Sequence, residues 1–187
     1  MTRRVFYDFE FLENGETIRP ISIGMTDDEG TEYYAVFAQA PWKEIAQHEF
    51  LMREVVPLLP LLHGDARMQA PKKNYCAIDF NNPLVKSTDD IKLEVAHYLL
   101  NSRNPVDELW ADYCAYDHVA LAQLLGPRMI EMPEGVPWFT NDLQQLWRRA
   151  GKPEKPTQDP EREHNALDDA RYDKELWHVC QQALDRE

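Results

Sequence analysis

The sequence has no long apolar run. None of its hydrophobic stretches approaches the roughly 20 residues that cross a membrane. The chain opens with Met-Thr-Arg-Arg and continues directly into a strand-like segment, without the apolar region of a secretory signal. We therefore expect a cytoplasmic protein with no membrane partner.

Cysteine and positive charge are also scarce. The three cysteines, Cys76, Cys114 and Cys180, lie far apart without a CxxC pair, which predicts reduced, packed thiols instead of disulfides or a zinc site. The net charge is -13, with 20 Lys and Arg against 33 Asp and Glu. Phosphate binding draws on Lys and Arg, so this charge argues against a protein that coats nucleic acid by general electrostatics. It does not exclude an enzyme whose local carboxylates are neutralised by metal ions.

The 187 residues, 43% of them hydrophobic, predict one α/β domain spanning residues 1–187. Aromatic and β-branched residues predict an antiparallel three-strand meander, with Asn14-Gly15 as a two-residue hairpin turn. The strands are expected at 3–12, 17–26, 32–38 and 108–114, and the helices at 42–56, 87–100, 117–125, 141–150 and 165–184. The proline-containing stretch 57–83 is expected to be a mobile or functional loop, and 152–160 an extended linker.

Two carboxylates lie two residues apart in the first predicted strand. Side chains alternate along a strand, so Asp8 and Glu10 project from the same face about 7 Å apart and can both reach one cation. Two acidic residues on a sheet face can also be simply solvated. The segment from Val5 to Leu12 is otherwise apolar or aromatic, however, and a buried unpaired carboxylate is costly unless it coordinates a metal or finds a hydrogen-bond partner. The strand alone leaves both interpretations open.

The final predicted helix distinguishes two adjacent aspartates. Its apolar stripe, at roughly 100° per residue, consists of Ala166, Ala170, Trp177, Cys180 and Leu184. Asp169 lies beside this stripe, whereas Asp168 points largely away and is expected to be solvated. Asp173 also falls near the stripe, and periodicity does not dismiss it. His164 stands five residues before Asp169, at the start of the helix, where it is a candidate general base; a lone histidine is otherwise usually structural or exposed.

Four acidic residues and one histidine stand in three short motifs spread over the chain. Tyr-Asp-Phe-Glu contains Asp8 and Glu10, Tyr-Asp-His-Val-Ala-Leu contains Asp117, and His-Asn-Ala-Leu-Asp-Asp-Ala-Arg contains His164 and Asp169. In this order they resemble the motifs of the DnaQ-like 3′-5′ exonucleases of the DEDDh subgroup. With its Asn-Gly turn and Ile-Ser-Ile-Gly strand, the whole sequence looks closest to the small single-domain 3′-5′ exoribonucleases of actinobacteria and phages.

This resemblance implies a ribonuclease H-like α/β fold, in which helices flank a mixed sheet made of an antiparallel meander followed by parallel strands. It implies a 3′-5′ exoribonuclease that hydrolyses single-stranded RNA, or 3′ overhangs, to nucleoside 5′-monophosphates by a two-metal-ion mechanism. Asp8, Glu10, Asp117 and Asp169 would hold the two divalent cations, Mg²⁺ or Mn²⁺, and His164 would be the general base. A homodimer is implied as well.

Substrate contacts are less specified by the motifs. Phe9, Phe11 and Leu12 are candidates, because aromatic side chains stack on the bases of single strands, although such residues are equally typical of a sheet core. The pairs Lys72-Lys73 and Arg148-Arg149 are either phosphate contacts or solvated surface charge, and we favour the latter.

Three other functions compete with this hypothesis. A DNA 3′-5′ exonuclease would use the same metal centre, because the contact to the 2′-hydroxyl that distinguishes RNA is not written in a motif. A catalytically inactive nuclease-fold protein would act as a binding module, but all five reactive residues are present. A calcium-binding or structural role is disfavoured, since no EF-hand-like loop occurs and the acidic residues come from distant segments.

Overall fold

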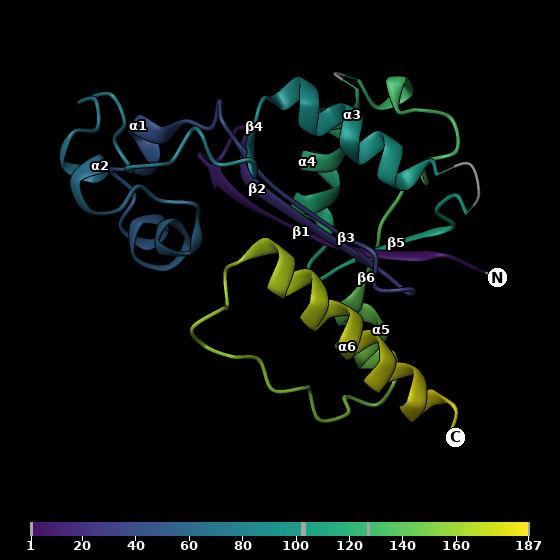
Figure 1. The fold of residues 1–187 in the computed structure, drawn as a ribbon. Coiled ribbons are helices and arrows are strands. Elements are labelled where there is room, and N and C mark those ends of the chain that lie inside the picture. Colours follow the sequence, from purple (N-terminus) through teal and green to yellow (C-terminus); the bar gives the residue numbers. More distant parts are fainter. Residues whose placement is uncertain (1, 102–103, 127, 187) are drawn as a thin grey trace.

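The computed structural model describes residues 2–101, 104–126 and 128–186, and its centre is a six-stranded mixed sheet (Figure 1). The strand order is β4-β3-β2-β1-β5-β6. The strands β1 (Arg4–Glu13), β2 (Ile18–Asp27) and β3 (Glu32–Phe37) form the antiparallel meander. The short strands β4 (Val85–Lys86), β5 (Glu108–Ala111) and β6 (Asn141–Asp142) add in parallel to β3, β1 and β5, respectively. The predicted fold class is thereby confirmed.

Helices cover both faces of the sheet. Figure 1 shows α3 (Thr88–Leu99) and α4 (Ala115–Leu125) on one side, and α5 (Leu143–Arg149) and α6 (Ala166–Leu184) on the other. The side chains of β1 alternate between the two faces of the sheet. Val5, Tyr7 and Phe9 belong to the main core, whereas Phe6 belongs to the smaller core that α5 and α6 form with the sheet. The even-numbered positions of β1 before its bulge therefore face α6.

A lobe built from residues 42–80 lies beyond one end of the sheet (Figure 1). It contains α1 (Trp42–Ile45), the π-helical turn η1 (Leu51–Val55), the 3-10 turn η2 (Val56–Leu58) and α2 (Gly64–Met68). The single helix predicted after Pro41 is therefore wrong. The ring Nδ1 of His48 accepts a hydrogen bond from the Leu51 N–H, where the helical chain restarts after α1. The stretch 57–83 is irregular as predicted, apart from η2, α2 and an isolated bridge between Leu61 and Ile78.

Several predicted boundaries hold because side chains fix them. Ser87 caps α3 by accepting a hydrogen bond from the Asp90 N–H, and Asn165 caps α6 by accepting from the Leu167 and Asp168 N–H groups. The predicted two-residue hairpin turn is wrong: residues 14–17 connect β1 to β2, and the Asn14 side chain accepts from the Glu16 and Thr17 N–H groups.

The second half of the chain also differs in detail from the expectation. The strand predicted to reach residue 114 ends at Ala111, and residues 141–142 form β6 before α5 begins. The turn η3 (Met129–Glu131) follows α4. The three cysteines are free thiols. Within the described ranges, no helix combines the length and apolar character that a membrane crossing requires.

Candidate active site

Asp8 and Glu10 lie on the face of β1 that α6 covers. Their partners on β2 are Gly24 and Ser22, respectively. Gly24 is required at this place, because an added Cβ would lie 2.2 Å from the backbone of Ala166 and Leu167. The first turn of α6 therefore rests directly on β2, next to Asp8, and brings the last motif of the chain to the first.

Glu10, His164 and Asp169 converge at this contact. One ligand atom from each lies within 4.8 Å of the other two. The ring Nδ1 of His164 is 3.9 Å from Oε1 of Glu10, and the main-chain N–H of His164 donates to Oδ2 of Asp169 at 3.0 Å. His164 has a left-handed backbone (φ 70°), a conformation uncommon outside glycine, which fits a side chain held in one place by its surroundings. The structure thus unites three residues that the sequence predicted to act together.

Asp117 and Asp8 complete the cluster. The Oδ1 atom of Asp117, in the first turn of α4, accepts a hydrogen bond of 2.9 Å from the Phe9 N–H, between the two acidic residues of β1. The Oδ2 atom of Asp8 is buried, and no described residue gives it a hydrogen bond. All five predicted site residues therefore meet where β1, α4 and the start of α6 come together.

The four carboxyl groups of the site have raised pKa values, chiefly because they are buried. Burial raises the pKa of Asp8 well above its ordinary value, and the charges of Asp117, Glu10 and Asp169 add to the increase. Burial and the charges of Asp169 and Asp117 likewise raise the pKa of Glu10. Burial is the main reason that the pKa of Asp117 is about 7 and that of Asp169 about 6.

This set of groups fits a divalent metal centre. Among the residues that the structure describes, none of the four carboxylates forms a salt bridge with Lys or Arg. Uncompensated carboxylates are costly when buried, and hard cations such as Mg²⁺ are bound by such oxygen ligands. The unpartnered Oδ2 atom of Asp8 is a coordination position that only a cation or a proton donor would satisfy.

The two rival aspartates of α6 have other partners. Asp168 forms salt bridges with Arg162 and Arg171, and only 14% of its side chain is exposed, so the prediction of a solvated Asp168 is wrong. Asp173 is buried and accepts a hydrogen bond from the Asp112 N–H at 3.0 Å. It ties α6 to the turn after β5. Periodicity left Asp173 open as a site residue, and this hydrogen bond gives it a structural role.

The predicted substrate contacts divide into buried and accessible side chains. Phe9 and Leu12 are 3% and 6% exposed and belong to the core, so burial leaves them no surface for an RNA base. Phe11 is half-buried and stacks on Tyr116, with 5.8 Å between ring centroids. The Tyr116 side chain is 54% exposed. Burial argues against base stacking by Phe9 and Leu12, and the prediction of substrate contacts stays a proposal for Phe11.

Sequence reasoning missed three neighbours of the site. Tyr116 was noticeable only through its position next to Asp117. Gln158, in the extended linker before α6, donates a hydrogen bond to Oδ1 of Asp169. Phe50 lies edge-on to the His164 ring, at 5.0 Å between centroids, and is 39% exposed. No motif or periodicity links Phe50 or Gln158 to the site, because tertiary folding alone brings them there.

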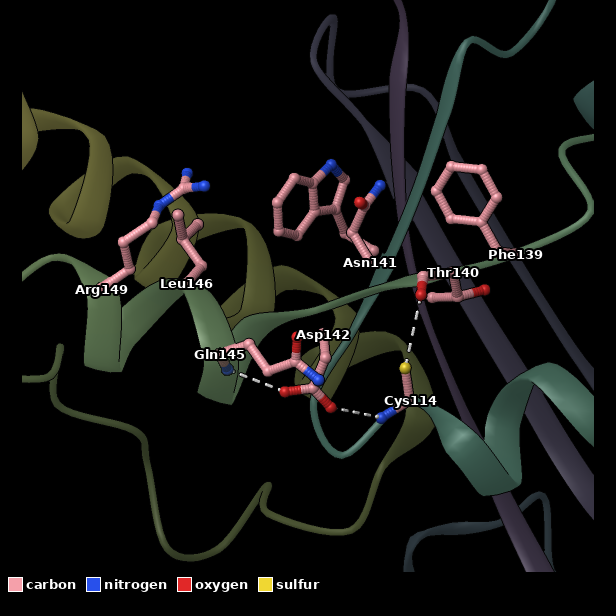
Figure 2. Close-up of a pocket in the computed structure, with 9 residues that line it drawn as sticks. Cys114, Phe139, Thr140, Asn141, Asp142, Gln145, Leu146 and Arg149 are labelled. Carbon is pink, nitrogen blue, oxygen red and sulfur yellow. Dashed lines mark hydrogen bonds between the residues drawn. The ribbon is translucent and has the colours of Figure 1, made fainter.

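A cavity of about 410 Å³ at the β6 edge of the sheet lies apart from this cluster (Figure 2). Its lining includes Cys114, Phe139 and Asp142, but none of the five predicted site residues. Asp142 accepts hydrogen bonds from the N–H groups of Cys114 and Gln145, as Figure 2 shows, and so joins the turn before α4 to the start of α5. We assign this cavity no part in the metal centre.

Comparison with known proteins points to one family. Residues 65–181 match the family described as the 3′-5′ exoribonuclease Rv2179c-like domain. The chain is 39% identical over 168 residues to the 3′-5′ exoribonuclease Rv2179c of Mycobacterium tuberculosis strain H37Rv, and to the 3′-5′ exoribonuclease MT2234.1 of strain CDC 1551. Each alignment covers 90% of this chain and 87% of the relative, so it extends well beyond the residues matched by the family.

Proposed function

The chain belongs to the Rv2179c-like 3′-5′ exoribonuclease family, and from this premise we propose that it shortens single-stranded RNA, or 3′ overhangs, from the 3′ end. The products would be nucleoside 5′-monophosphates. The observation that carries the proposal is the convergence of four carboxylates without a basic partner on one histidine, from three segments that are far apart in the sequence. Catalytic sites are commonly assembled in this way.

Asp8, Glu10, Asp117 and Asp169 would hold two divalent cations, Mg²⁺ or Mn²⁺. When bound, such ions stabilise negative charge on a phosphate and lower the pKa of a coordinated water. The chain's own contribution is to fix the ligands: the Phe9 N–H orients the Asp117 carboxylate, and the His164 N–H and Gln158 orient that of Asp169.

His164 is the proposed general base. About a third of its side chain is exposed, so an attacking water can reach the ring, while Phe50 packs against the ring and holds it beside Glu10. The ring nitrogen would accept the proton of that water as the new bond to phosphorus forms and the bond from phosphorus to the 3′ oxygen of the preceding nucleotide breaks.

A labelling experiment tests the reaction class and the nucleic acid together. We expect 5′-labelled single-stranded RNA to shorten from the 3′ end with Mg²⁺ or Mn²⁺ and to remain intact with EDTA. A DNA oligonucleotide of the same sequence serves as the comparison, because the metal centre alone does not distinguish the two sugars. Faster cleavage of the DNA would favour assignment as a DNA exonuclease over assignment as an exoribonuclease. RNA that stays intact under all conditions would support a role as a binding module.

We also propose that the chain forms one domain and assembles as a homodimer. A single sheet with helices on both faces includes elements from both ends of the chain, which supports one domain. The adjacent residues Trp138 and Phe139 are 55% and 65% exposed, and Phe139 lines the cavity of Figure 2; association would cover these apolar side chains. Light scattering should give twice the chain mass of 21.9 kDa; a mass of 21.9 kDa would refute the dimer.

A further inference from the structure

The lobe of residues 42–80 encloses a second cavity, of about 570 Å³, which we call the upstream groove. Its volume lies within the roughly 300–1,000 Å³ typical of ligand sites. The lining consists of Met52, Val56, Pro57, Leu61, Arg67, Ala70, Pro71, Lys72, Asn74, Tyr75, Cys76 and Ala77. It contains two cations and no acidic side chain. This is unusual in a chain with 33 acidic and 20 basic residues.

The two cations of the groove have no partners within the described chain. Arg67 and Lys72 are exposed, and neither forms a hydrogen bond or an ion pair through its side chain with a described residue. Lys73 follows directly and is exposed as well. By contrast, Arg53 at the neighbouring η1 pairs with Glu49 and Glu54. The groove therefore presents uncompensated positive charge on a protein of net charge -13.

An aromatic side chain stands among these charges. Tyr75 lines the groove and is 47% exposed, so part of its ring faces solvent. Sites for single-stranded nucleic acid combine a positively charged groove that follows the backbone with aromatic rings on which bases stack. The upstream groove contains both parts.

The groove and the candidate active site share one helical segment. Phe50 contacts the ring of His164, and Met52, two residues further along the same helical segment, lines the groove. Two helical residues span about 3 Å along the axis. Residues two apart in a helix point to nearly opposite sides, so a chain that leaves the carboxylates past His164 on the Phe50 side would pass around this segment to reach the groove.

We propose that the upstream groove binds the backbone of single-stranded RNA on the 5′ side of the nucleotide that is removed, with Arg67 and Lys72 at phosphates and Tyr75 against a base. This inference rests on the proposed function, which places the 3′-terminal phosphodiester at the carboxylates. It also revises the interpretation of Lys72 as solvated surface charge, because Lys72 shares its cavity with a second free cation and a ring.

The test compares two double variants with the same loss of charge. Arg67→Ala with Lys72→Ala removes the groove's cations. The control, Arg186→Ala with Lys92→Ala, removes one arginine and one lysine that lie outside the groove and, within the described chain, have no side-chain hydrogen bond or ion pair. Fluorescence anisotropy with a labelled twelve-nucleotide RNA in EDTA measures binding without metal-dependent turnover. Cleavage of this RNA and of a dinucleotide with Mg²⁺ measures the rate.

We expect the groove variant to bind the longer RNA roughly five- to tenfold more weakly, and the control to bind within about twofold of the wild type. The slope of log Kd against log salt should fall by about 0.7 for each phosphate that the variant no longer neutralises. The reduction in kcat/KM should be several times larger for the long RNA than for the dinucleotide. A variant with Arg67→Lys and Lys72→Arg should retain binding, which separates charge from damage to the fold.

Three outcomes decide between the inferences. If the groove variant and the control reduce RNA binding equally, or if neither reduces it, the proposal that the groove binds RNA would be refuted. If the wild-type protein binds RNA through the groove but does not shorten it, the proposed function would be refuted, whereas the RNA-binding role of the groove would remain supported. Wild-type protein that neither binds nor shortens RNA would refute both.

Discussion

At the scale of single residues, the two adjacent aspartates of α6 should behave differently. Asp169 faces Glu10 and His164, whereas Asp168 is occupied by Arg162 and Arg171. We expect Asp169→Asn to lower kcat/KM by at least about 100-fold, because it removes a charged metal ligand. Asp168→Asn should retain most of the activity and cost about 1 kcal/mol of stability or less, since both arginines are partly exposed. Equal loss of activity in the two variants would contradict the assignment.

His164 allows metal binding to be separated from proton transfer. Replacing it with alanine leaves the four carboxylates in place, so calorimetry should still show Mg²⁺ binding. The cleavage rate should fall by about 10²–10⁴-fold, the usual contribution of a positioned general base. Phe50→Ala is the companion variant: it frees the ring that Phe50 holds and should reduce the rate by a smaller factor. A rate unchanged in His164→Ala would remove this residue from the mechanism.

At the scale of elements, the site depends on how closely α6 approaches β2. In Gly24→Ala the new methyl group would meet the backbone of Ala166 at 2.2 Å, and a helix backbone has no flexible end that can move aside. The start of α6, with Asp169, has to shift. We expect a loss of about 1–3 kcal/mol in unfolding free energy. Because a displaced ligand impairs the site as well, kcat should also fall.

Gly30→Ala is the matched control for this prediction. Gly30 stands in the turn between β2 and β3 with φ 81°, and an added Cβ would meet no atom within 4 Å. Alanine there strains the backbone and lowers stability, yet leaves α6 in place. Denaturation and kinetics on both variants separate general destabilisation from displacement of the site. Full activity in Gly24→Ala would show that α6 does not position Asp169 through this contact.

The elements that could be predicted are those whose signals lie within their own sequence. The strands of the meander carry enough aromatic and β-branched residues, and α3 and α6 carry their own caps in Ser87 and Asn165. Strands β5 and β6, with four and two residues, owe their extent to pairing with a neighbouring strand, so the end of β5 was misplaced and β6 was predicted as the start of a helix. The broken helix after Pro41 depends on contacts within the lobe, which no local pattern records.

In the candidate site, too, the residues with a local sequence signal could be predicted, whereas those that tertiary contacts bring there could not. Asp8, Glu10, Asp117, His164 and Asp169 could be predicted as one group because three short motifs contain them. Alternation along β1 turns the Phe9 side chain into the main core, on the face opposite to Asp8. Phe50 reaches His164 only after the lobe has folded against the end of the sheet.

At the scale of the whole molecule, the net charge of -13 and an RNA substrate have to be reconciled. Repulsion from the surface opposes the approach of a polyanion, and it is compensated only where positive charge is concentrated. Bound cations would supply such charge at the carboxylates, and Arg67 and Lys72 supply it in the upstream groove. The remaining, acidic surface would weaken nonspecific binding of RNA outside these two places.

The stability of the metal-free protein should depend on pH in the direction set by these carboxylates. The pKa of Asp117 is about 7 and that of Asp169 about 6 in the folded chain, against an ordinary value of 3.8, mainly because both groups are buried. The folded state thus binds protons that the unfolded state has released between these values, and the contribution of these two groups to the unfolding free energy falls as pH rises from about 4 to 7. Thermal unfolding in EDTA should therefore show a melting temperature that decreases over this range.

Added Mg²⁺ should raise the melting temperature most at pH 7, where the carboxylates lose their protons and bind the ion. A melting temperature that rises from pH 4 to 7 in EDTA, or that Mg²⁺ leaves unchanged at pH 7, would contradict a metal centre built from these residues.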